Sequence, residues 1–399
     1  MGKGYMGKIL WVDVARRKAE EEGLGDDIYK NFLCGYGLGA KIVYDRQKGS
    51  KIDPLGEDNI LGYCTGLLTA TGSLFTGRYM AVGKSPLTGG WGDANCGGYF
   101  SPELKKTGYD ALFLTGKSDK PVYIWINDGK VEVRDASHLW GMDAITTELV
   151  LRKELKSDKI QVACIGQGGE KLSLISGIVN ERGRIAARSG LGAVMGSKKV
   201  KAVVVSGTKK VEVHDRKQIN DLSKKFMKAL QRPLPGSNFL LHYVRHLGRL
   251  MRILPYQQKQ ESITYRDLLK KYGTCGMTAL FVECGDVPVK NWKGSGYHDF
   301  PITKKAYKIS DLEVIKYEKE KYYCFSCPLG CGGIMKLEEA PYHIEEIHKT
   351  EHETLSALGS LCLNDDLKAI IKMNDMLNRA GLDTISAGVT VAFAMECYE

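Results

Sequence analysis

The sequence predicts an α+β protein with a β-rich N-terminal part followed by a mainly α-helical part. Two observations carry this prediction. Short β-type runs alternate with glycines in the first half of the chain, and from about Val213 onward amphipathic helical spacing replaces them. A length of 399 residues is enough for two or three domains. We therefore expect one domain over residues 1–208 and a second over residues 209–399.

The individual elements follow from local patterns. Residues 8–14 and 159–165 are expected to be strands, and residues 122–126 and 131–133 form a hairpin pattern around an Asn-Asp-Gly turn. Residues 143–155 have helical spacing, with Ile145, Leu149 and Leu151 as the apolar positions. A Lys-rich amphipathic helix is expected over residues 215–230. A helix is expected over residues 366–377, ended by Gly381, which suits a helix C-terminus. Asp383 or Thr384 is expected to cap a second helix that runs to residue 398.

The first half also contains an internal repeat. Residues 98–116 and 190–207 each combine a glycine-rich turn, a short helix pattern with a Lys-Lys pair, and an apolar strand ending in Ser/Thr-Gly. Two such units predict a pseudo-twofold domain with two similar pockets. A chance likeness of two glycine-bounded strands is the alternative.

Composition limits the class of protein. The formal net charge of +10 comes from dispersed lysines, and no nucleic-acid-binding motif is present, so the charge favours an acidic protein partner over nucleic acid. No apolar run is long enough to span a bilayer, and the N-terminus lacks the apolar core of a signal peptide. With these features, eleven cysteines indicate reduced thiols and metal ligands in a cytoplasmic protein.

A cysteine motif stands out in the C-terminal half. Cys324, Cys327 and Cys331 have the spacing C-x2-C-x3-C, with a proline and glycines nearby. A tight turn can bring such thiolates to one centre, which favours an iron–sulfur cluster that takes a fourth ligand from elsewhere. A structural zinc site is the alternative, although zinc sites usually show two separated pairs or a histidine partner.

Two segments suit an anionic ligand. Residues 76–100 combine several glycines with Arg78, and residues 182–192 carry three arginines beside a glycine-rich turn. Neither has the spacing of a nucleotide P-loop or of a dinucleotide fingerprint. Ordinary turns are the alternative interpretation.

Two further segments are candidates. Residues 378–386 contain a helix start, whose free N–H groups suit an anion or a polar heterocycle, or simply an ordinary helix–turn–helix. His352 and Glu353 begin another helix pattern and are candidates for proton transfer, or for simple matching of the helix dipole.

Taken together, these segments resemble the tungsten-containing aldehyde:ferredoxin oxidoreductase family along essentially the whole chain. The matching motifs are GKILWVD at 7–13, DPL at 53–55, GRY at 77–79, KSPLTG at 84–89, ANCGGYF at 94–100, DASHLWG at 135–141, GAVMGSK at 192–198, PVKNW at 288–292, CFSCPLGC at 324–331 and GLDTIS at 381–386.

The resemblance implies a tungsten (or molybdenum) ion held by two pterins, a [4Fe–4S] cluster and a magnesium ion, on a β-rich pterin-binding domain. Cys324, Cys327 and Cys331 would ligate the cluster, and the main-chain carbonyls of Asn95 and Ile185 would hold magnesium. Cofactor-binding residues carried over by motif are Arg78, Asn95, Gly97, Arg184, Ile185, Ala187, Arg188, Asn378, Leu382 and Asp383.

The implied activity is oxidation of a small aldehyde to a carboxylic acid. Electrons would leave through the cluster to ferredoxin or a similar acidic carrier, while Glu353, with His352 beside it, handles a proton. The implied assembly is a homo-oligomer or a complex with iron–sulfur partner subunits.

The sequence also departs from the family pattern. A third, helical domain that carries the fourth cluster cysteine is expected to be absent, because the chain stops at Glu399 within a predicted helix. Asn378 stands where the family usually has aspartate, and His352 where it commonly has tyrosine. These departures keep two alternatives open: a tungsten subunit of a larger complex that reduces activated aromatic or carboxylic acids, and a non-catalytic iron–sulfur or zinc-binding fragment.

Overall fold

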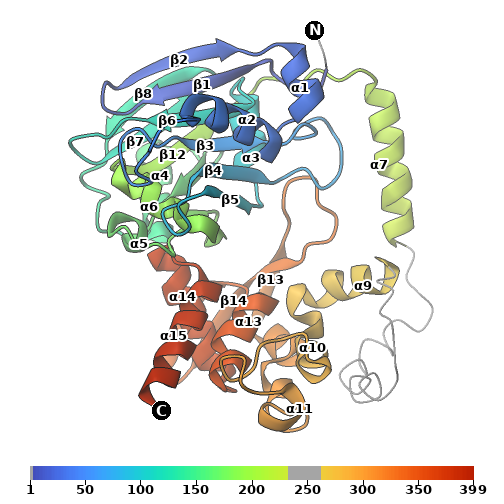
Figure 1. Ribbon diagram of the computed structural model, residues 1–399. Helices are drawn as coiled ribbons and strands as arrows, with labels where there is room; N and C mark the ends of the chain where they lie inside the picture. Colours follow the sequence, from blue (N-terminus) through green and yellow to red (C-terminus); the bar gives the residue numbers. More distant parts are fainter. Residues whose placement is uncertain (1–2, 232–261) are drawn as a thin grey trace. The chain divides into compact units, whose positions relative to one another are not determined.

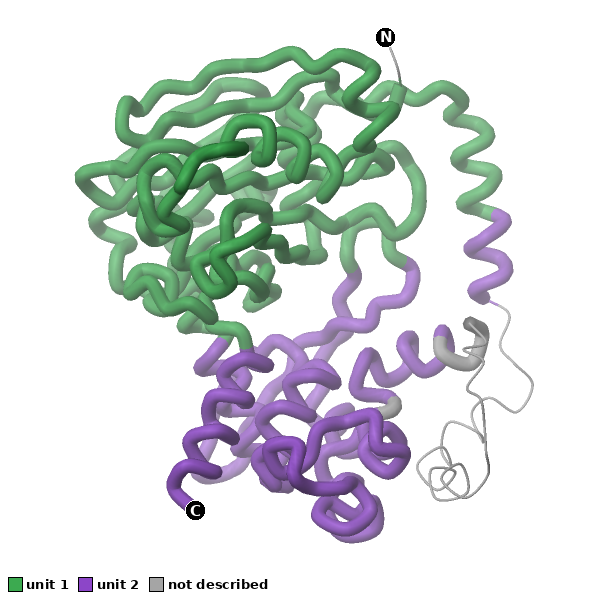
Figure 2. Tube along the Cα trace, viewed as in Figure 1, with its two compact units in different colours: residues 1–224, 324–327, 378–383 green, residues 225–323, 328–377, 384–399 purple. Residues whose placement is uncertain are grey.

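A computed structural model describes residues 3–231 and 262–399, which form two compact units. Unit 1 contains residues 1–224 together with two short returns of the chain, residues 324–327 and 378–383 (Figure 2). Unit 2 contains residues 225–323, 328–377 and 384–399. The cysteine motif is therefore divided, with Cys324 and Cys327 in unit 1 and Cys331 in unit 2.

Unit 1 is built on two six-stranded sheets (Figure 1). The first has the order β2-β1-β6-β3-β4-β5, in which only β1 and β6 are parallel. Its strands are β1 (Lys8–Asp13), β2 (Lys18–Gly23), β3 (Leu61–Thr65), β4 (Tyr79–Lys84), β5 (Trp91–Cys96) and β6 (Ala111–Thr115).

The second sheet repeats this topology. Its order is β8-β7-β12-β9-β10-β11, and again only one pair, β7 with β12, is parallel. Helix α3 (Phe100–Lys106) leads into β6, and α6 (Leu191–Ser197) leads into β12, as the internal repeat predicts. The pseudo-twofold character is therefore confirmed. The strands are β7 (Val122–Asn127), β8 (Lys130–Asp135), β9 (Gln161–Cys164), β10 (Ile178–Asn180), β11 (Arg184–Ala186) and β12 (Val200–Ser206).

The core of unit 1 lies between these sheets. Successive side chains of a strand point to opposite faces, so in β6 Leu112 and Leu114 join the central core with α3 and α6, while Phe113 packs on the outer side with α2. Helix α4 covers the outer face of the second sheet. The remaining helices of unit 1 are α1 (Asp26–Phe32), α2 (Tyr36–Gln47), α4 (Ala144–Glu154), α5 (Gln167–Glu170), the short 3₁₀ helix η1 (Arg188–Gly190) and α7 (Arg216–Gln231), which continues into unit 2.

One detail of α4 corrects the sequence interpretation. The helix begins after Asp143, whose carboxylate accepts a hydrogen bond from the Thr146 backbone N–H at 2.9 Å. Leu149, however, is 62% exposed, and Glu148 is buried instead. The Arg152 guanidinium holds the Glu148 carboxylate at 2.7 Å, so an ion pair occupies the inner face where a leucine was predicted.

Unit 2 is mainly helical and adds a sheet that the sequence interpretation did not include. Strands β13 (Glu318–Tyr322), β14 (Gly332–Glu339) and β15 (Tyr342–His348) are antiparallel, and β14 and β15 form a hairpin. Met335 and Ile347 from this sheet share a core with Leu355 and Ile370. The helices are α9 (Ser262–Tyr272), η2 (Thr274–Met277), α10 (Thr278–Cys284), α11 (Gly296–Asp299), η3 (Ala306–Ile309), α12 (Asp311–Val314), η4 (Ile315–Tyr317), α13 (His352–Leu358), η5 (Ser360–Cys362), α14 (Leu367–Ala380) and α15 (Thr384–Tyr398).

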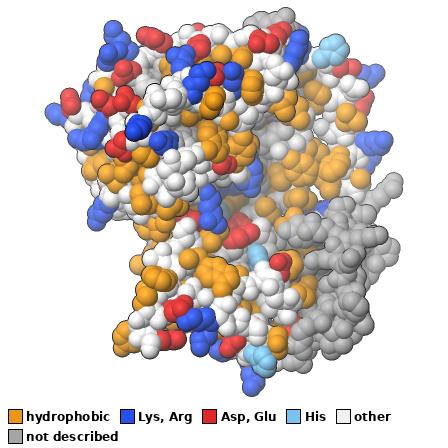
Figure 3. All heavy atoms as spheres, viewed as in Figure 1, with side chains coloured by type: hydrophobic (Ala, Val, Ile, Leu, Met, Phe, Trp, Pro, Cys, Tyr) orange, Lys and Arg blue, Asp and Glu red, His pale blue; other side chains and the backbone are white. Residues whose placement is uncertain are grey.

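The surface agrees with the dispersed charge of the sequence. Basic and acidic side chains alternate over the face drawn in Figure 3 and do not gather in one block. Within the described ranges, no helix combines the length and apolar character needed to cross a bilayer.

Candidate cofactor site

The first group of predicted residues meets on two neighbouring strands of unit 1. Arg78 directly precedes β4, and Asn95 lies in β5, which pairs antiparallel with β4. The Arg78 guanidinium donates a hydrogen bond to the Asn95 side-chain oxygen, and the Asn95 amide donates to the Tyr36 hydroxyl at 2.7 Å. Both predicted side chains are exposed, so they form a polar surface available to an anionic ligand.

Next to this pair, glycines pack against the segment that carries the first two cysteines of the motif. A Cβ atom on Gly97 would lie 2.6 Å from the Cys324 sulfur, and one on Gly77 would lie 2.8 Å from the Phe325 nitrogen. The Phe325 N–H donates to the Gly98 carbonyl at 3.1 Å, and the Phe75 N–H donates to the Ser326 carbonyl at 2.8 Å. Only glycine allows this close approach, which places the segment 324–327 against residues predicted to bind a cofactor.

The second predicted segment approaches the same cysteine from the other sheet. Arg184 begins β11, and its Nη1 atom lies 2.9 Å from the Cys324 sulfur. Asn180, at the end of β10, donates to the Gly97 carbonyl at 3.1 Å. Strands β5 and β11 are equivalent edge strands of the two sheets and are in contact. The pseudo-twofold fold thus brings the segments that carry Asn95 and Ile185 together.

Residues 378–383 of the third predicted segment belong to unit 1 and lie beside the second sheet. Leu382 forms an antiparallel bridge with Ser176, and the Asp383 N–H donates to the Ile175 carbonyl at 2.9 Å. Gly381 has a φ of +72°, which suits glycine at a helix end. Arg188 Nη1 lies 3.5 Å from Asp383 Oδ2, so an arginine of the second segment pairs with a predicted residue of the third.

The remaining residues of these segments vary in exposure. Asn378 and Asp383 are almost fully buried, whereas the Arg188 side chain is 57% exposed. Ile185 pairs with Val179 within the β10–β11 hairpin, and Ala187 follows β11 directly. Arg188 is therefore the member of this set that offers an accessible cation.

The three cysteines of the motif are of intermediate burial and form no disulfide among the described residues. The Cys327 N–H donates to the Cys324 carbonyl at 3.0 Å, which closes the expected tight turn. Over residues 3–231 and 262–399, no three Cys, His, Asp or Glu side chains are grouped closely enough to hold a metal ion. The role of the motif as a cluster site stays a prediction.

In unit 2, His352 and Glu353 begin helix α13 as expected. His352 Nδ1 lies 2.9 Å from the Thr278 hydroxyl, and its ring meets Phe281 edge-on. The His352 N–H donates to the Thr274 hydroxyl at 3.0 Å, and that hydroxyl also contacts the Glu351 carboxylate. Glu353 is exposed in the first helical turn, so its carboxylate is accessible to solvent while His352 is held in place.

The environment of His352 predicts a pH effect on stability. Burial lowers the pKa of His352, and the nearby carboxylates of Glu353 and Asp286 oppose this shift only in part. Below about pH 6.5, the ordinary pKa of histidine, the unfolded chain binds this proton before the folded chain does. The free energy of unfolding should therefore fall as the pH decreases from 7 to 5.

Replacing His352 with Gln should reduce this loss of stability, measured as the difference in Tm between pH 7 and pH 5. The matched control is His343→Gln, because His343 is exposed on β15 of the same unit. An equal difference in Tm for wild type and His352→Gln would contradict the prediction.

Sequence reasoning did not identify Glu181. This partly buried residue lies in the turn between β10 and β11, where Glu181, Arg182 and Gly183 all have positive φ. Its carboxylate accepts a hydrogen bond from the Tyr99 N–H and faces Arg184, and burial raises the pKa of Glu181. The Asn-Glu-Arg-Gly turn between two short apolar strands was the only local signal for it.

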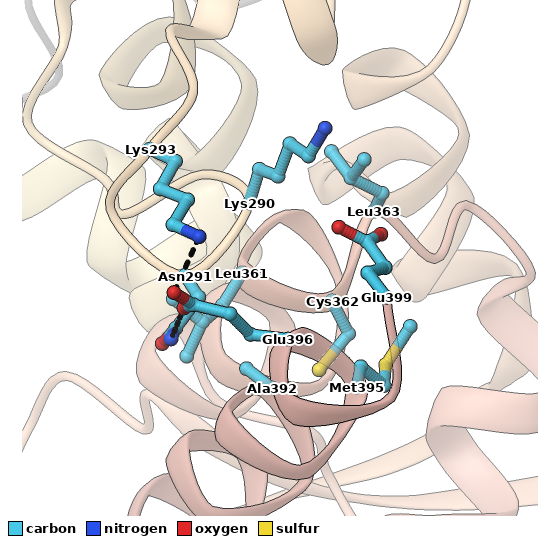
Figure 4. Close-up of a pocket in the computed structure, with 10 residues that line it drawn as sticks. All are labelled: Lys290, Asn291, Lys293, Leu361, Cys362, Leu363, Ala392, Met395, Glu396 and Glu399. Atoms are coloured by element: carbon cyan, nitrogen blue, oxygen red, sulfur yellow. Dashed lines mark hydrogen bonds and ion pairs between the residues drawn. The ribbon is translucent and has the colours of Figure 1, made fainter.

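A separate pocket opens to solvent in unit 2. It is lined by apolar side chains of η5 and α15, such as Leu361 and Met395, and by Lys293, which pairs with Glu396 (Figure 4). None of the predicted site residues lines this pocket.

Comparison with known proteins gives matches over most of the chain. Residues 9–207 match the family model "Aldehyde ferredoxin oxidoreductase, N-terminal domain", and residues 255–399 match "Aldehyde ferredoxin oxidoreductase, domains 2 & 3". The tungsten-containing aldehyde ferredoxin oxidoreductases of Pyrococcus horikoshii and Pyrococcus furiosus are 37% and 36% identical over 99% of this chain. The chain spans 59% of the length of each of these relatives.

Two other similar proteins have different names. The WOR-like subunit of an aliphatic sulfonate oxidoreductase from Pyrococcus furiosus is 30% identical over 99% of this chain and 60% of its own length. A solved structure of the active-site complex BamBC of benzoyl coenzyme A reductase, with 1,5-dienoyl-CoA, has a TM-score of 0.74 and 29% identity. That match covers 99% of this chain and 56% of the solved chain.

Proposed function

Because the chain belongs to the aldehyde ferredoxin oxidoreductase family of tungsten enzymes, we propose that it binds a tungsten–bis-pterin group and oxidises aldehydes to carboxylic acids. The observation that carries this proposal lies within unit 1, where two predicted cofactor segments contact Cys324 and the third pairs with Arg188 of the second segment. An arginine-rich surface next to a cysteine held by glycine turns suits an anionic cofactor beside an iron–sulfur cluster.

The residues of unit 1 have binding and orienting roles in this proposal. The exposed guanidinium groups of Arg78 and Arg188 offer planar donors to pterin phosphates. The main-chain carbonyls of Asn95 and Ile185, on the adjacent strands β5 and β11, would hold magnesium between those phosphates. Asn378, Leu382 and Asp383 would bind the second pterin, with Gly97 and Ala187 allowing close backbone approach.

When bound, the tungsten–pterin group would supply the two-electron oxidation. Cys324, Cys327 and Cys331 would hold the [4Fe–4S] cluster, which would supply one-electron transfer. Overall, an aldehyde and water give a carboxylic acid, two protons and two electrons. Glu353 would take up one proton at its accessible carboxylate. His352, held by Thr278 and Phe281, would shape the substrate side of this region.

The proposed electron acceptor is ferredoxin or a similar acidic carrier. The formal net charge of +10 would favour its encounter with the protein through complementary potentials. We further propose that the protein acts in the cytoplasm, as a homo-oligomer or with iron–sulfur partner subunits.

A second candidate is a tungsten subunit of a larger complex that reduces an activated acid or an aromatic ring. Two of the similar proteins favour it, since one is named as a subunit and the other is part of the BamBC complex of benzoyl coenzyme A reductase. Stable co-purification with iron–sulfur or flavin subunits under anaerobic conditions would support this candidate. Purification without such subunits, together with ferredoxin-linked aldehyde oxidation, would exclude it.

The metal content of the protein, purified anaerobically from its own source, tests the proposed function. We expect tungsten together with about four iron atoms per chain, as one cubane cluster requires. Elemental analysis for tungsten, molybdenum, iron and zinc gives the answer directly. Iron or zinc without tungsten or molybdenum would overturn the proposed catalytic role, and protein free of all four metals would overturn cofactor binding as well.

A further inference from the structure

Arg184 contacts the sulfur of Cys324, a cysteine predicted to ligate the iron–sulfur cluster. We propose that Arg184 is a positioning residue for the iron–sulfur cluster, and that its hydrogen bond to the Cys324 sulfur raises the reduction potential of that cluster. This inference rests on the proposed function, because it requires a cluster on Cys324. The resemblance to the family implies only that Arg184 binds pterin.

The Arg184 guanidinium is held close to the Cys324 sulfur by the fold of unit 1. Arg184 Nη1 lies 2.9 Å from the Cys324 sulfur, and the Arg184 side chain is only 11% exposed. Gly97 leaves room for both groups, because a Cβ atom there would lie 2.6 Å from the sulfur and 3.2 Å from Arg184 Nη1. The three residues come from different parts of unit 1, so the contact depends on the folded unit and not on a local turn.

A carboxylate on the other side orients the guanidinium. Glu181 Oε2 lies 3.6 Å from Arg184 Nε, and the Glu181 side chain is 16% exposed. The Tyr99 N–H donates to Glu181 Oε1, which anchors this carboxylate to the turn that follows Gly97. Glu181 and the sulfur therefore hold opposite ends of one planar group, which limits its rotation.

The physical effect follows from charge. A reduced [4Fe–4S] cluster carries one more negative charge than the oxidised cluster, so a cationic N–H donor at a ligand sulfur stabilises the reduced form more. Burial strengthens this difference, because solvent screens the interaction weakly there. The same hairpin bears residues predicted to bind pterin, so the contact also links pterin binding to the cluster that receives the electrons.

The test measures the reduction potential of the cluster in the anaerobically isolated holoprotein, by titration with dithionite followed by EPR. In Arg184→Met, at the potential where the wild-type cluster is half reduced, the ratio of reduced to oxidised cluster should fall about tenfold. Arg184→Lys keeps the charge but loses the planar fork, and its ratio should fall about threefold. Iron content is measured in each variant.

The matched control is Lys106→Met. Lys106 lies over the Phe325 ring at 5.6 Å and pairs with Glu103, so it carries a positive charge beside the same cysteine segment. Its side chain is 31% exposed, and its ammonium group contacts the Phe325 ring and the Glu103 carboxylate instead of the sulfur. Its replacement should change the ratio less than about twofold.

The outcomes separate this inference from the proposed function. A lower potential in Arg184→Met with full iron content, beyond the change in Lys106→Met, supports the inference. An unchanged potential with full iron content overturns the inference and leaves the proposed function intact. If Arg184→Met loses iron, Arg184→Lys and Glu181→Gln decide, and wild-type potentials in both would overturn it. Wild-type protein without iron would overturn the proposed cluster and this inference together.

Discussion

Replacing Glu353 with glutamine is expected to lower kcat for aldehyde oxidation by about a hundredfold or more, while tungsten and iron contents stay at wild-type levels. Glutamine matches the size of glutamate but cannot take up the proton that aldehyde oxidation releases. Glu353 is exposed at the start of α13 and makes no contribution to the buried core of unit 2, so the fold should tolerate the change. Steady-state rates with an artificial one-electron acceptor would measure the effect.

The control for this variant is Glu345→Gln. Glu345 is a glutamate of the same unit, lies on β15 with a side chain 79% exposed, and pairs with Lys336 at 3.2 Å. Its replacement removes the same charge from the same unit and should leave kcat unchanged. A wild-type kcat in Glu353→Gln would show that another group handles the proton.

Replacing Gly97 with alanine is expected to remove most of the bound iron. The added methyl carbon would lie 2.6 Å from the Cys324 sulfur, well inside van der Waals contact, so the cysteine segment must move away. Thiolate ligation tolerates little displacement, because the cluster needs its sulfurs at one centre. Iron analysis and the visible absorption of the cluster would measure the loss.

Gly90→Ala provides a matched comparison. Gly90 lies in the turn before β5, and the nearest atom to a Cβ there is the Thr88 hydroxyl at 3.8 Å. This variant should keep full iron content. If Gly97→Ala also retained its iron, the packing of the cysteine segment against Gly97 would be irrelevant to the cluster.

Much of unit 1 could be predicted from the sequence because its signals are local. The Asn-Asp-Gly turn set the hairpin of β7 and β8, and Asp143 marked the start of α4. The repeated glycine–helix–strand pattern gave the pseudo-twofold character, since each copy forms the same α3–β6 or α6–β12 unit. Gly381 likewise marked the end of α14.

Other features had no local signal. Helical spacing placed Leu149 inside, yet the face of α4 that packs on the second sheet carries Ala144 and Leu151. Glu148 lies on the same buried face, paired with Arg152. The charged segment 336–350 did not suggest a strand pair. The sheet it belongs to is completed by β13, which pairs with residues 332–335 of β14 across the whole cysteine motif. Glu181 lies outside every sequence motif on which the resemblance to the family rests.

By itself, the sequence determined the family, the arrangement of the two sheets of unit 1 as related halves, and the segments that bear Arg78, Arg184 and Cys324. These properties depend on residue types and short spacings, which a chain displays without folding. Only the tertiary structure decided that Arg184 contacts the Cys324 sulfur and that Glu181 supports it. Arg184 and Cys324 are 140 residues apart in the chain, and they meet because glycine turns let the segment 324–327 return to unit 1.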